Sequence, residues 1–445
     1  MSLPKSFYLW NIGCQMNRAD AARLSEALEQ RGYLATQEPS EADLLILNTC
    51  VVRQSAENKV VGRLTSLKSL KRHRERRSDR RLLVMGCFVG DMDELAEAYP
   101  FVDAFFGPSD IAGVLEYVDQ QDQRPSGDAT LEDPLSPPEI AEQVPISYGC
   151  NHHCTYCIVA LRRGRQQSRP VEEIHQEVEQ LVSRGAREVT LLGQNVDAYG
   201  SDLPGDVTLS TVLRAIHDID GMWRIRFLTS HPQEMTDEII ATATGLPKVC
   251  ESWELPFQSG DDDVLRRMGR GYTVARFRDL VSRIRAATAP RDCAINTDVI
   301  VGFPGETAEQ FQHTLDLVRE LRFDIVHVAA YSPRPGTAAA RLVDDVPAAE
   351  KERRRAAIEE AQTEIAAEIN AQLLGRDVEL LVDGLQGGRW RGRTRTNKLV
   401  FFDTDGDAPG AGARSATNWL GRLVRARITW TGPWSMRAST PRVLR

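Results

Sequence analysis

The chain has 445 residues, of which 42% are hydrophobic and 27% are charged, and its formal net charge is −8. This length exceeds one hydrophobic core and predicts two to four domains of ordinary globular composition. No apolar run approaches the roughly 20 residues of a membrane span, and the first residues lack the features of a signal peptide. We therefore expect no membrane association and a cytoplasmic location.

The net charge alone argues against a nucleic-acid partner, but the charge is unevenly distributed. Residues 63–81 carry nine Lys and Arg against two acids, and residues 370–445 carry thirteen against six, so each segment has a local charge of +7. Basic zones on an acidic chain are compatible with a polyanionic partner. For residues 63–81 a solvated helix and loop is an equally good interpretation.

The first part of the chain, residues 5–120, alternates apolar runs with helical stretches. The predicted strands are 7–12, 43–47 and 82–85, and the predicted helices are 18–31 and 55–72. Strands separated by a helix form parallel crossover units. We expect an N-terminal parallel α/β domain.

Each of these three apolar runs ends near a cysteine: Cys14, Cys50 and Cys87, with gaps of 36 and 37 residues. The carboxyl ends of parallel strands share the edge where ligands bind in open α/β sheets. Thiols stay reduced in the cytoplasm, so clustered cysteines suggest a metal centre. We predict that the three hold an iron–sulfur cluster with one open iron. The alternative is three buried cysteines that act as small hydrophobic residues.

The middle of the chain resumes the alternation after a segment, 119–145, that reads as a linker. The predicted strands are 144–148, 188–192, 224–229, 252–257, 294–301 and 324–331. The predicted helices between them are 171–184, 209–219, 236–243, 273–287 and 307–321, with a long one at 346–374. Six steps are too few for an eight-strand barrel. We therefore expect a partial (β/α)6 barrel over residues 136–368.

The last part, residues 370–440, alternates apolar and polar residues around Gly-rich turns and predicts a small β-barrel of about five strands. Four arginines in it, Arg389, Arg391, Arg393 and Arg395, alternate and would project to one face of a strand. Their expected role is to neutralise phosphates. A solvated sheet face is the alternative.

The stretch "YGCNHHCTYC" places Cys150, Cys154 and Cys157 in a C-x-x-x-C-x-x-C spacing. Three thiolates this close indicate a soft metal centre, and a four-iron cube with three cysteines keeps one open coordination position. The alternative is a zinc site with His152 or His153 as the fourth ligand.

The cysteine spacing after a first strand resembles that of the radical S-adenosylmethionine (SAM) superfamily. The resemblance implies that SAM binds the open iron and is split to a 5′-deoxyadenosyl radical. It places Tyr156 near the adenine, and "TDVIVGFPGET" beside the adenine through Ile300 and Gly302. If the barrel prediction holds, Gln194 and Asn195 point into the same cavity and are candidates for polar contacts.

Nearly the whole chain resembles the methylthiotransferase family. The stretches that carry the resemblance are "GCQMN", "ADLLILNTCVVR", "LLGQNVDAYG", "RFLTSHP", "LPFQSGDDDVLRRMGRGYT" and "YSPRPGT". The Gln-Met-Asn after Cys14 is most similar to the MiaB-type branch, which adds a methylthio group to C2 of N6-prenylated adenosine at position 37 of tRNA. His152, His153 and Ala160 depart from the family pattern, but none of them is a thiol.

The resemblance implies two 4Fe-4S clusters that face one cavity, SAM as cofactor, and a terminal RNA-binding (TRAM) barrel. The implied partners are the anticodon stem-loop of tRNA and an electron donor such as flavodoxin or ferredoxin, and we expect a monomer. Three alternatives stay open: the same chemistry on threonylcarbamoyl-adenosine or on a ribosomal-protein aspartate, a non-catalytic RNA-binding iron–sulfur protein, and a radical enzyme that uses the second cluster for electron transfer.

Overall fold

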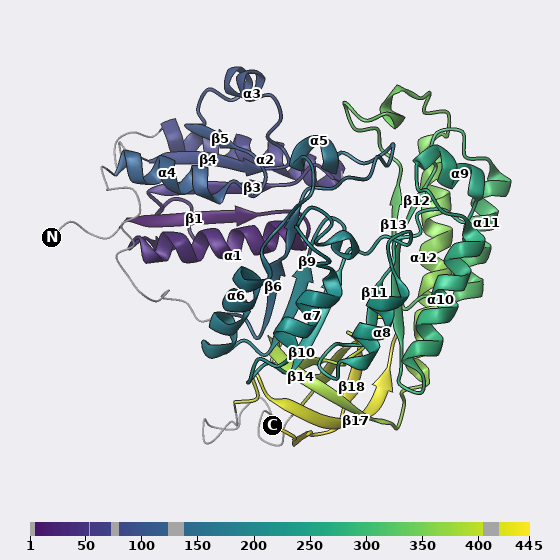
Figure 1. The fold of residues 1–445 in the computed structure, drawn as a ribbon. Coiled ribbons are helices and arrows are strands. Elements are labelled where there is room, and N and C mark those ends of the chain that lie inside the picture. The colour runs from purple at the N-terminus through teal and green to yellow at the C-terminus, as the bar shows by residue number, and fades with distance from the viewer. Residues whose placement is uncertain (1–4, 53, 73–79, 123–137, 404–417) are drawn as a thin grey trace. The chain divides into compact units, whose positions relative to one another are not determined.

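The computed structural model of the chain describes residues 5–52, 54–72, 80–122, 138–403 and 418–445 (Figure 1). The chain divides into two compact units. The first comprises residues 1–137, 148–152 and 157–166, and the second comprises residues 138–147, 153–156 and 167–445. The predicted central and C-terminal domains thus fall in one unit, and the division into three domains stays a prediction.

The first unit contains a five-stranded parallel sheet in the order β2-β1-β3-β4-β5. Its strands are β1 (Ser6–Asn11), β2 (Leu34–Ala35), β3 (Leu44–Thr49), β4 (Arg81–Gly86) and β5 (Ala104–Phe106). Its helices are α1 (Gln15–Gln30), α2 (Gln54–Arg72), α3 (Met92–Ala98) and α4 (Ile111–Gln121), followed by α5 (Val159–Arg163) from the later segment. The predicted parallel α/β character is confirmed.

Both faces of this sheet are buried, which explains why its strands read as continuous apolar runs. Leu24 and Leu28 of α1 pack with Phe7 and Ile46 on one face. Leu64 of α2 joins a separate core on the other face. The sequence prediction missed the short elements β2, α3, β5 and α4, because segments of two to eleven residues leave little periodic signal.

The second unit contains six parallel strands in two sheets, β10-β9-β6 and β11-β12-β13. The strands are β6 (Ala141–Pro145), β9 (Glu188–Leu192), β10 (Arg224–Leu228), β11 (Ser252–Glu254), β12 (Ala294–Val301) and β13 (Ile325–Ala330). The helices are α6 (Val171–Ser183), α7 (Leu209–His217), α8 (Asp237–Gly245), α9 (Asp262–Met268), α10 (Val274–Thr288), α11 (Ala308–Leu321) and α12 (Ala348–Ala371). Short elements are β8 (Gln167–Ser168), η1 (Val196–Ala198) and η2 (Ala339–Arg341), and β7 (Ser147–Tyr148) has one residue in each unit.

One large core joins these strands to their helices, with Val189, Phe227, Trp253 and Ile295 packed under α6, α7, α10 and α11. Since side chains alternate along a strand, the residues between these face the opposite side of the sheets. The predicted linker 119–145 is wrong at both ends, because α4 continues to Gln121 and residues 141–145 form β6. Residues 123–137 of that prediction lie outside the described residues.

The C-terminal strands form a small closed barrel. The strands are β14 (Asp377–Gln386), β15 (Arg389–Arg393), β16 (Leu399–Phe402), β17 (Leu423–Thr431), β18 (Met436–Ala438) and β19 (Arg442–Val443). They pair in the order β14-β15-β16-β18-β17-β19, and an additional β14–β17 pairing closes a ring of five. Closure removes the exposed edges that an open sheet would leave. The predicted small barrel is confirmed.

None of the helices drawn from the described residues combines the length and the hydropathy that crossing a bilayer requires.

Candidate active site

Cys14, Cys50 and Cys87 meet at the carboxyl edge of the first sheet. β1 pairs with β3 at Asn11↔Asn48, and β3 pairs with β4 up to Thr49↔Gly86. Cys50 and Cys87 directly follow β3 and β4, and Cys14 comes shortly after β1, so the three residues lie at the ends of neighbouring strands. Cys14 is exposed, whereas Cys50 and Cys87 are buried.

The backbone around these thiols approaches so closely that it requires glycine. A Cβ on Gly13 would lie 2.7 Å from Cβ of Cys50, and a Cβ on Gly86 would lie 2.4 Å from the carbonyl oxygen of Thr49. Both glycines have φ in the left-handed region, at +143° and +104°. The chain therefore packs closely around the three cysteines at this edge of the sheet, and the two glycines make this close approach possible.

The thiols also influence one another electrostatically. Burial raises the pKa of Cys50 to about 11, and the neighbouring Cys14 and Cys87 add to this effect. Burial is also the main reason that the pKa of Cys87 is raised, with Cys14 contributing. Buried thiols of this kind stay protonated until a cation compensates their charge, so cluster assembly must release protons.

Among the described residues, no group of three or more His, Cys, Asp or Glu is placed to hold one metal ion. This gives no support to the zinc alternative with His152 or His153. A four-iron, four-sulfur cluster requires a different arrangement of ligands from a single metal ion, because each thiolate binds a separate iron. The three-sulfur donor set fits such a cluster.

Cys150, Cys154 and Cys157 lie in the segment between β7 and α5, with Cys150 and Cys157 assigned to the first unit and Cys154 to the second. The backbone N–H of Cys150 donates to the carbonyl of Gly164 across 3.1 Å. The Cys150 sulfur accepts the N–H of His152 across 3.4 Å. Hydrogen bonds to sulfur favour the thiolate form that a metal requires.

Within the second unit, residues 153–156 are fixed by the end of α9. Thr155 donates from its N–H to the carbonyl of Met268 and from Oγ1 to the carbonyl of Arg267, and its own carbonyl accepts the N–H of Ala339. Arg270 is 5% exposed and donates from Nη1 to the Cys154 sulfur across 3.5 Å. The sequence prediction missed Arg270.

Two of the residues predicted to contact SAM are brought together. Tyr156 and Ile300 both pack against one apolar cluster that contains Met268, Phe303 and Tyr331. Gly302 has a φ of +70°, and a Cβ there would lie 2.4 Å from Cγ of Lys351 in α12. The backbone at Gly302, directly after β12, thus has a left-handed conformation that only glycine adopts without strain.

Gln194 and Asn195 follow the carboxyl end of β9. The side-chain carbonyl oxygens of both are buried, and neither accepts a hydrogen bond from any residue that the structure describes. Asn195 donates from Nδ2 to Glu234. Buried amide oxygens without partners are costly and indicate a missing donor.

The inner faces of β11 and β12 add polar residues that the sequence prediction did not identify. Glu254 pairs in register with Asn296, so both side chains lie on one face, and Asp298 follows two residues later. Burial raises the pKa of Glu254 to about 8, and Asp298 adds to the effect. The Asn296 and Gln258 side-chain oxygens are also buried without a partner among the described residues.

The four arginines of the predicted RNA-binding face are not equivalent. Arg389, Arg391 and Arg393 alternate along β15, whereas Arg395 follows the strand. Arg391 and Arg393 pair with Asp383, and Arg389 pairs with Asp403. Arg395 contacts both carboxylate oxygens of Glu251 within its own unit, at 2.7 and 2.9 Å.

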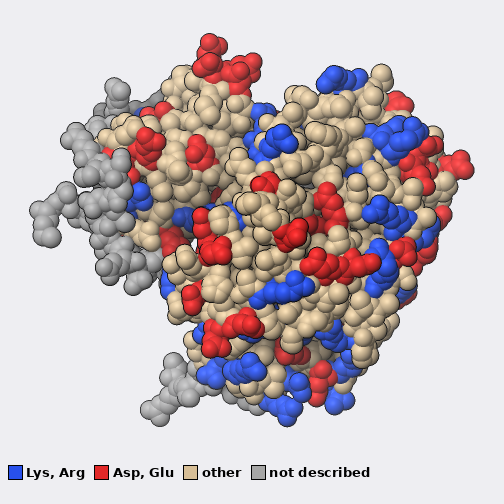
Figure 2. Space-filling model, viewed as in Figure 1, with Lys and Arg blue, Asp and Glu red and all other residues tan. Residues whose placement is uncertain are grey.

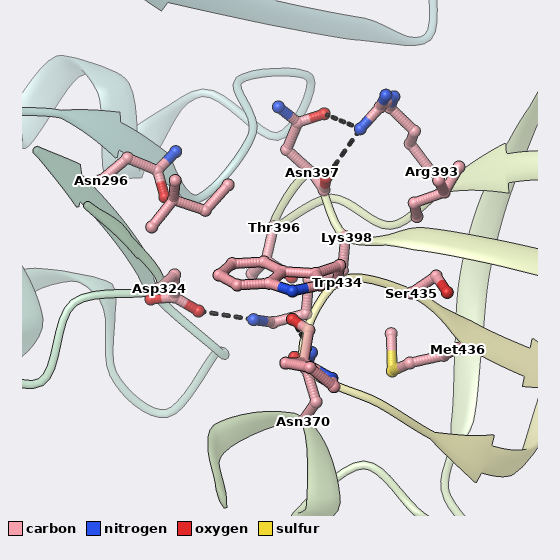
Figure 3. Close-up of a pocket in the computed structure, with 13 residues that line it drawn as sticks. Asn296, Asp324, Asn370, Arg393, Thr396, Asn397, Lys398, Trp434, Ser435 and Met436 are labelled. Atoms are coloured by element: carbon pink, nitrogen blue, oxygen red, sulfur yellow. Dashed lines mark hydrogen bonds and ion pairs between the residues drawn. The ribbon is translucent and has the colours of Figure 1, made fainter. Parts of the chain in front are cut away.

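Among the residues that the structure describes, two of the hollows lie beside the C-terminal barrel. The first, of roughly 200 Å³, lies at the amino ends of β12 and β13 and is lined by Asn296, Asp324 and Trp434 (Figure 3). Ligands of parallel sheets bind at the carboxyl ends, so this cavity is not a candidate for the reaction. The second is bordered by Arg389, Phe401, Trp430 and Arg437.

The chain matches the model of the Radical SAM superfamily over residues 144–318 and that of Uncharacterized protein family UPF0004 over residues 6–107. The fold is similar to that of the radical S-adenosylmethionine methyltransferase TsrM from Kitasatospora setae, with a TM-score of 0.55 at 14% identity over 86% of this chain and 79% of that one.

Two curated relatives show the family. One, from Roseiflexus sp. (strain RS-1), is 46% identical over 97% of this chain and 89% of its own length. Another, from Dehalococcoides mccartyi (strain CBDB1), is 46% identical over 98% and 99%. Both are named tRNA-2-methylthio-N(6)-dimethylallyladenosine synthase. The predicted family resemblance is confirmed: this chain belongs to the family of tRNA-2-methylthio-N(6)-dimethylallyladenosine synthases.

Proposed function

We propose that the chain transfers a methylthio group to C2 of an N6-prenylated adenosine at position 37 of tRNA. The observation that carries this function is an identity of 46% over 98% of this chain to a relative that bears this name. The convergence of Cys14, Cys50 and Cys87 at one sheet edge supports it independently.

The cofactors of this family are SAM and two 4Fe-4S clusters. We assign one cluster to Cys14, Cys50 and Cys87 and the other to Cys150, Cys154 and Cys157. When bound, SAM and its cluster supply a carbon-centred radical, which the unactivated C2–H bond requires because no side-chain base removes that hydrogen.

The residues of the second unit would then bind and orient SAM. Tyr156 and Ile300, which share one apolar cluster, offer a flat surface for the adenine. The left-handed backbone at Gly302 lets the strand end approach the nucleoside closely. The buried oxygens of Gln194 and Asn195 are acceptors for the hydrogen-bond donors of a bound ligand. We further propose that the two three-stranded sheets together make up the predicted partial (β/α)6 barrel.

For tRNA, the surface around the second hollow offers both charge and stacking. Trp430 is 48% exposed, and the guanidinium of Arg437 lies 5.4 Å from its ring centroid. Arg389 borders the same hollow. Arginines beside an exposed indole are suited to bind phosphates and to stack an unpaired base. Figure 2 shows Lys and Arg over the C-terminal strands and Asp and Glu gathered over α3.

Arg389 and Arg391, whose side chains are 42% and 38% exposed, are better candidates for phosphate contacts than Arg395, which is 26% exposed and pairs with the buried Glu251. Of the basic zone 63–81, residues 73–79 lie outside the described residues. We further propose a monomer that receives its electrons from a flavodoxin- or ferredoxin-type donor in the cytoplasm.

The deciding experiment is mass spectrometry of tRNA nucleosides from a strain that lacks this gene and from the same strain complemented with it. Loss of the methylthio group from prenylated adenosine, restored on complementation, would support the proposal. Loss from threonylcarbamoyl-adenosine instead would move the chain to a sister branch. An unchanged nucleoside profile, together with no 5′-deoxyadenosine from the reconstituted protein, would favour a non-catalytic RNA-binding protein.

A further inference from the structure

Arg163 is a buried arginine at the end of α5, six residues after Cys157 in the sequence. Its side chain is only 4% exposed. An arginine is seldom buried so deeply unless several partners compensate its charge. The segment that carries it, residues 157–166, belongs to the first unit, together with Cys14, Cys50 and Cys87.

Three side chains of the first unit fix the guanidinium. Nη1 donates to Oγ of Ser109 across 2.7 Å, and Nη2 donates to Oδ1 of Asn17 across 3.3 Å. Oδ2 of Asp20 lies 3.7 Å from Nη2. Ser109 in turn donates to Asp20 across 2.8 Å and is held at a φ of +61°. The planar guanidinium group of Arg163 is therefore held in one orientation.

The same network reaches the cysteines. The Cys14 sulfur lies 3.4 Å from Oδ1 of Asn17, the oxygen that also accepts from Arg163. Asn17 donates from Nδ2 to the carbonyl of Thr49 across 2.8 Å, directly before Cys50. Asn17 thus connects the guanidinium to the backbone that presents two of the three thiols.

The guanidinium also acts on the sulfurs directly. Its charge lowers the pKa values of both Cys50 and Cys87 against the larger effect of burial. Conversely, Cys87, Asp20 and Cys14 stabilise the charged arginine. Ile158, at the start of the same segment, packs against Val51 and Cys87.

We propose that Arg163 is a positioning residue for the cluster held by Cys14, Cys50 and Cys87, whose guanidinium offsets thiolate charge, fixes Asn17 beside the Cys14 sulfur and so raises the reduction potential of that cluster. The potential of an iron–sulfur cluster depends on its net charge and on the polar groups around its sulfurs, and Arg163 supplies a buried positive charge and fixes Asn17 beside the Cys14 sulfur. The proposal rests on the cluster assignment made above. It also means that the segment after Cys157 contributes a charge to the site of the other three cysteines.

The test uses the full-length chain with Cys150, Cys154 and Cys157 replaced by alanine, so that only the cluster of interest is assembled. Arg163→Gln removes the positive charge, and Arg163→Lys keeps the charge but lacks the planar guanidinium group. Arg165→Gln is the control because Arg165 is exposed. The measurements are iron per chain after anaerobic reconstitution and the midpoint potential from a redox titration followed by electron paramagnetic resonance.

We expect Arg163→Gln to shift the midpoint to a more negative potential, Arg163→Lys to shift it by a smaller amount, and Arg165→Gln to leave it unchanged. If Arg163→Gln loses its iron, retention of iron in Arg163→Lys with a negative shift also supports the proposal. An unchanged midpoint in an iron-loaded Arg163→Gln overturns it, as does loss of iron in both variants. Failure of the parent chain to bind iron would instead refute the cluster assignment, and this proposal with it.

Discussion

The guanidinium of Arg270 donates a hydrogen bond to the sulfur of Cys154 across 3.5 Å, although the two residues are 116 positions apart in the chain. Arg270 also donates to the carbonyl of Pro256 across 2.8 Å and lies over the ring of Tyr272. Arg270 thus brings a buried positive charge and a hydrogen-bond donor to the sulfur of a predicted cluster ligand.

Replacing this arginine should therefore affect both stability and iron binding. We expect Arg270→Gln to lower the free energy of unfolding by about 2 kcal/mol, because the hydrogen bonds that the buried guanidinium donates are lost. Iron bound by a chain that keeps only Cys150, Cys154 and Cys157 should fall as well. Urea denaturation and iron analysis measure the two effects. Arg266→Gln, whose side chain is 75% exposed, is the matched control; equal behaviour of the two variants would contradict the assigned role.

Iron content should report the two cysteine sets independently. The reconstituted chain is expected to hold about eight irons, and about four when either set is replaced by alanine, because each 4Fe-4S cluster contributes four. Cys250→Ala provides the control, since Cys250 is buried in the second unit and belongs to neither set. Colorimetric iron and sulfide analysis gives the count. Four irons in the unmodified chain would rule out a second cluster.

The backbone at Gly302 should tolerate no side chain. Gly302→Ala forces a left-handed φ of +70° on alanine and displaces Lys351, which pairs with Asp344 across 2.6 Å. We expect a loss of roughly 1–3 kcal/mol in the free energy of unfolding and weaker SAM binding by calorimetry. Gly245→Ala, at a position with open space around the added carbon, should change neither quantity. Unchanged SAM affinity in Gly302→Ala would place the nucleoside elsewhere.

Stability should depend on pH through Glu254. Burial, aided by Asp298, raises its pKa from 4.5 to about 8 in the folded state, so the folded chain binds this proton more tightly than the unfolded chain does. The stabilisation is fully present below about pH 4.5 and is lost as the pH rises through about 8. The melting temperature of the apo chain should therefore fall more steeply between about pH 5 and about pH 8 than the melting temperature of the Glu254→Gln variant. Parallel profiles would show that Glu254 ionises normally.

Binding of tRNA should depend on Trp430. Because a stacked base contributes about 1–3 kcal/mol, Trp430→Ala should weaken binding by roughly 5- to 150-fold. Arg437→Gln should weaken it less and should also flatten its salt dependence. Filter binding at several salt concentrations measures both. Trp434→Ala is the comparison, since Trp434 is also exposed but lines the other hollow. A larger loss of tRNA affinity in Trp434→Ala than in Trp430→Ala would show that the RNA contacts the surface around Trp434 instead.

The sequence predicted the long elements of the fold because their apolar runs are local signals. The strands 188–192 and 294–301 were predicted with the bounds that the structure has. The convergence of Cys14, Cys50 and Cys87 was also predictable, since parallel strands must end at one edge. In each case the information lies within a few residues of the position concerned.

The sequence did not reveal what depends on contacts between distant segments. Arg163 reaches Asn17 over 146 positions, and Arg270 reaches Cys154 over 116. Neither arginine lies in a pattern that distinguishes it from its exposed neighbours. The same limitation applies to Arg395, which was predicted to bind phosphate and which pairs with Glu251, 144 positions away. Burial decides the role of an arginine, and burial is a property of the folded chain.

Arg224 and Arg226 of β10 lie at the base of the second unit beside the buried Glu188. They donate to the main-chain carbonyls of Arg393 and Arg395, each across 2.7 Å and 169 positions further along the chain. A nascent chain that has left the ribosome only as far as α12 has these two guanidinium groups without their acceptors. The strand layer therefore reaches its final hydrogen bonding only once residues 393–395 have been synthesised, and a chain truncated after α12 would keep Glu188 but lose these two carbonyl acceptors.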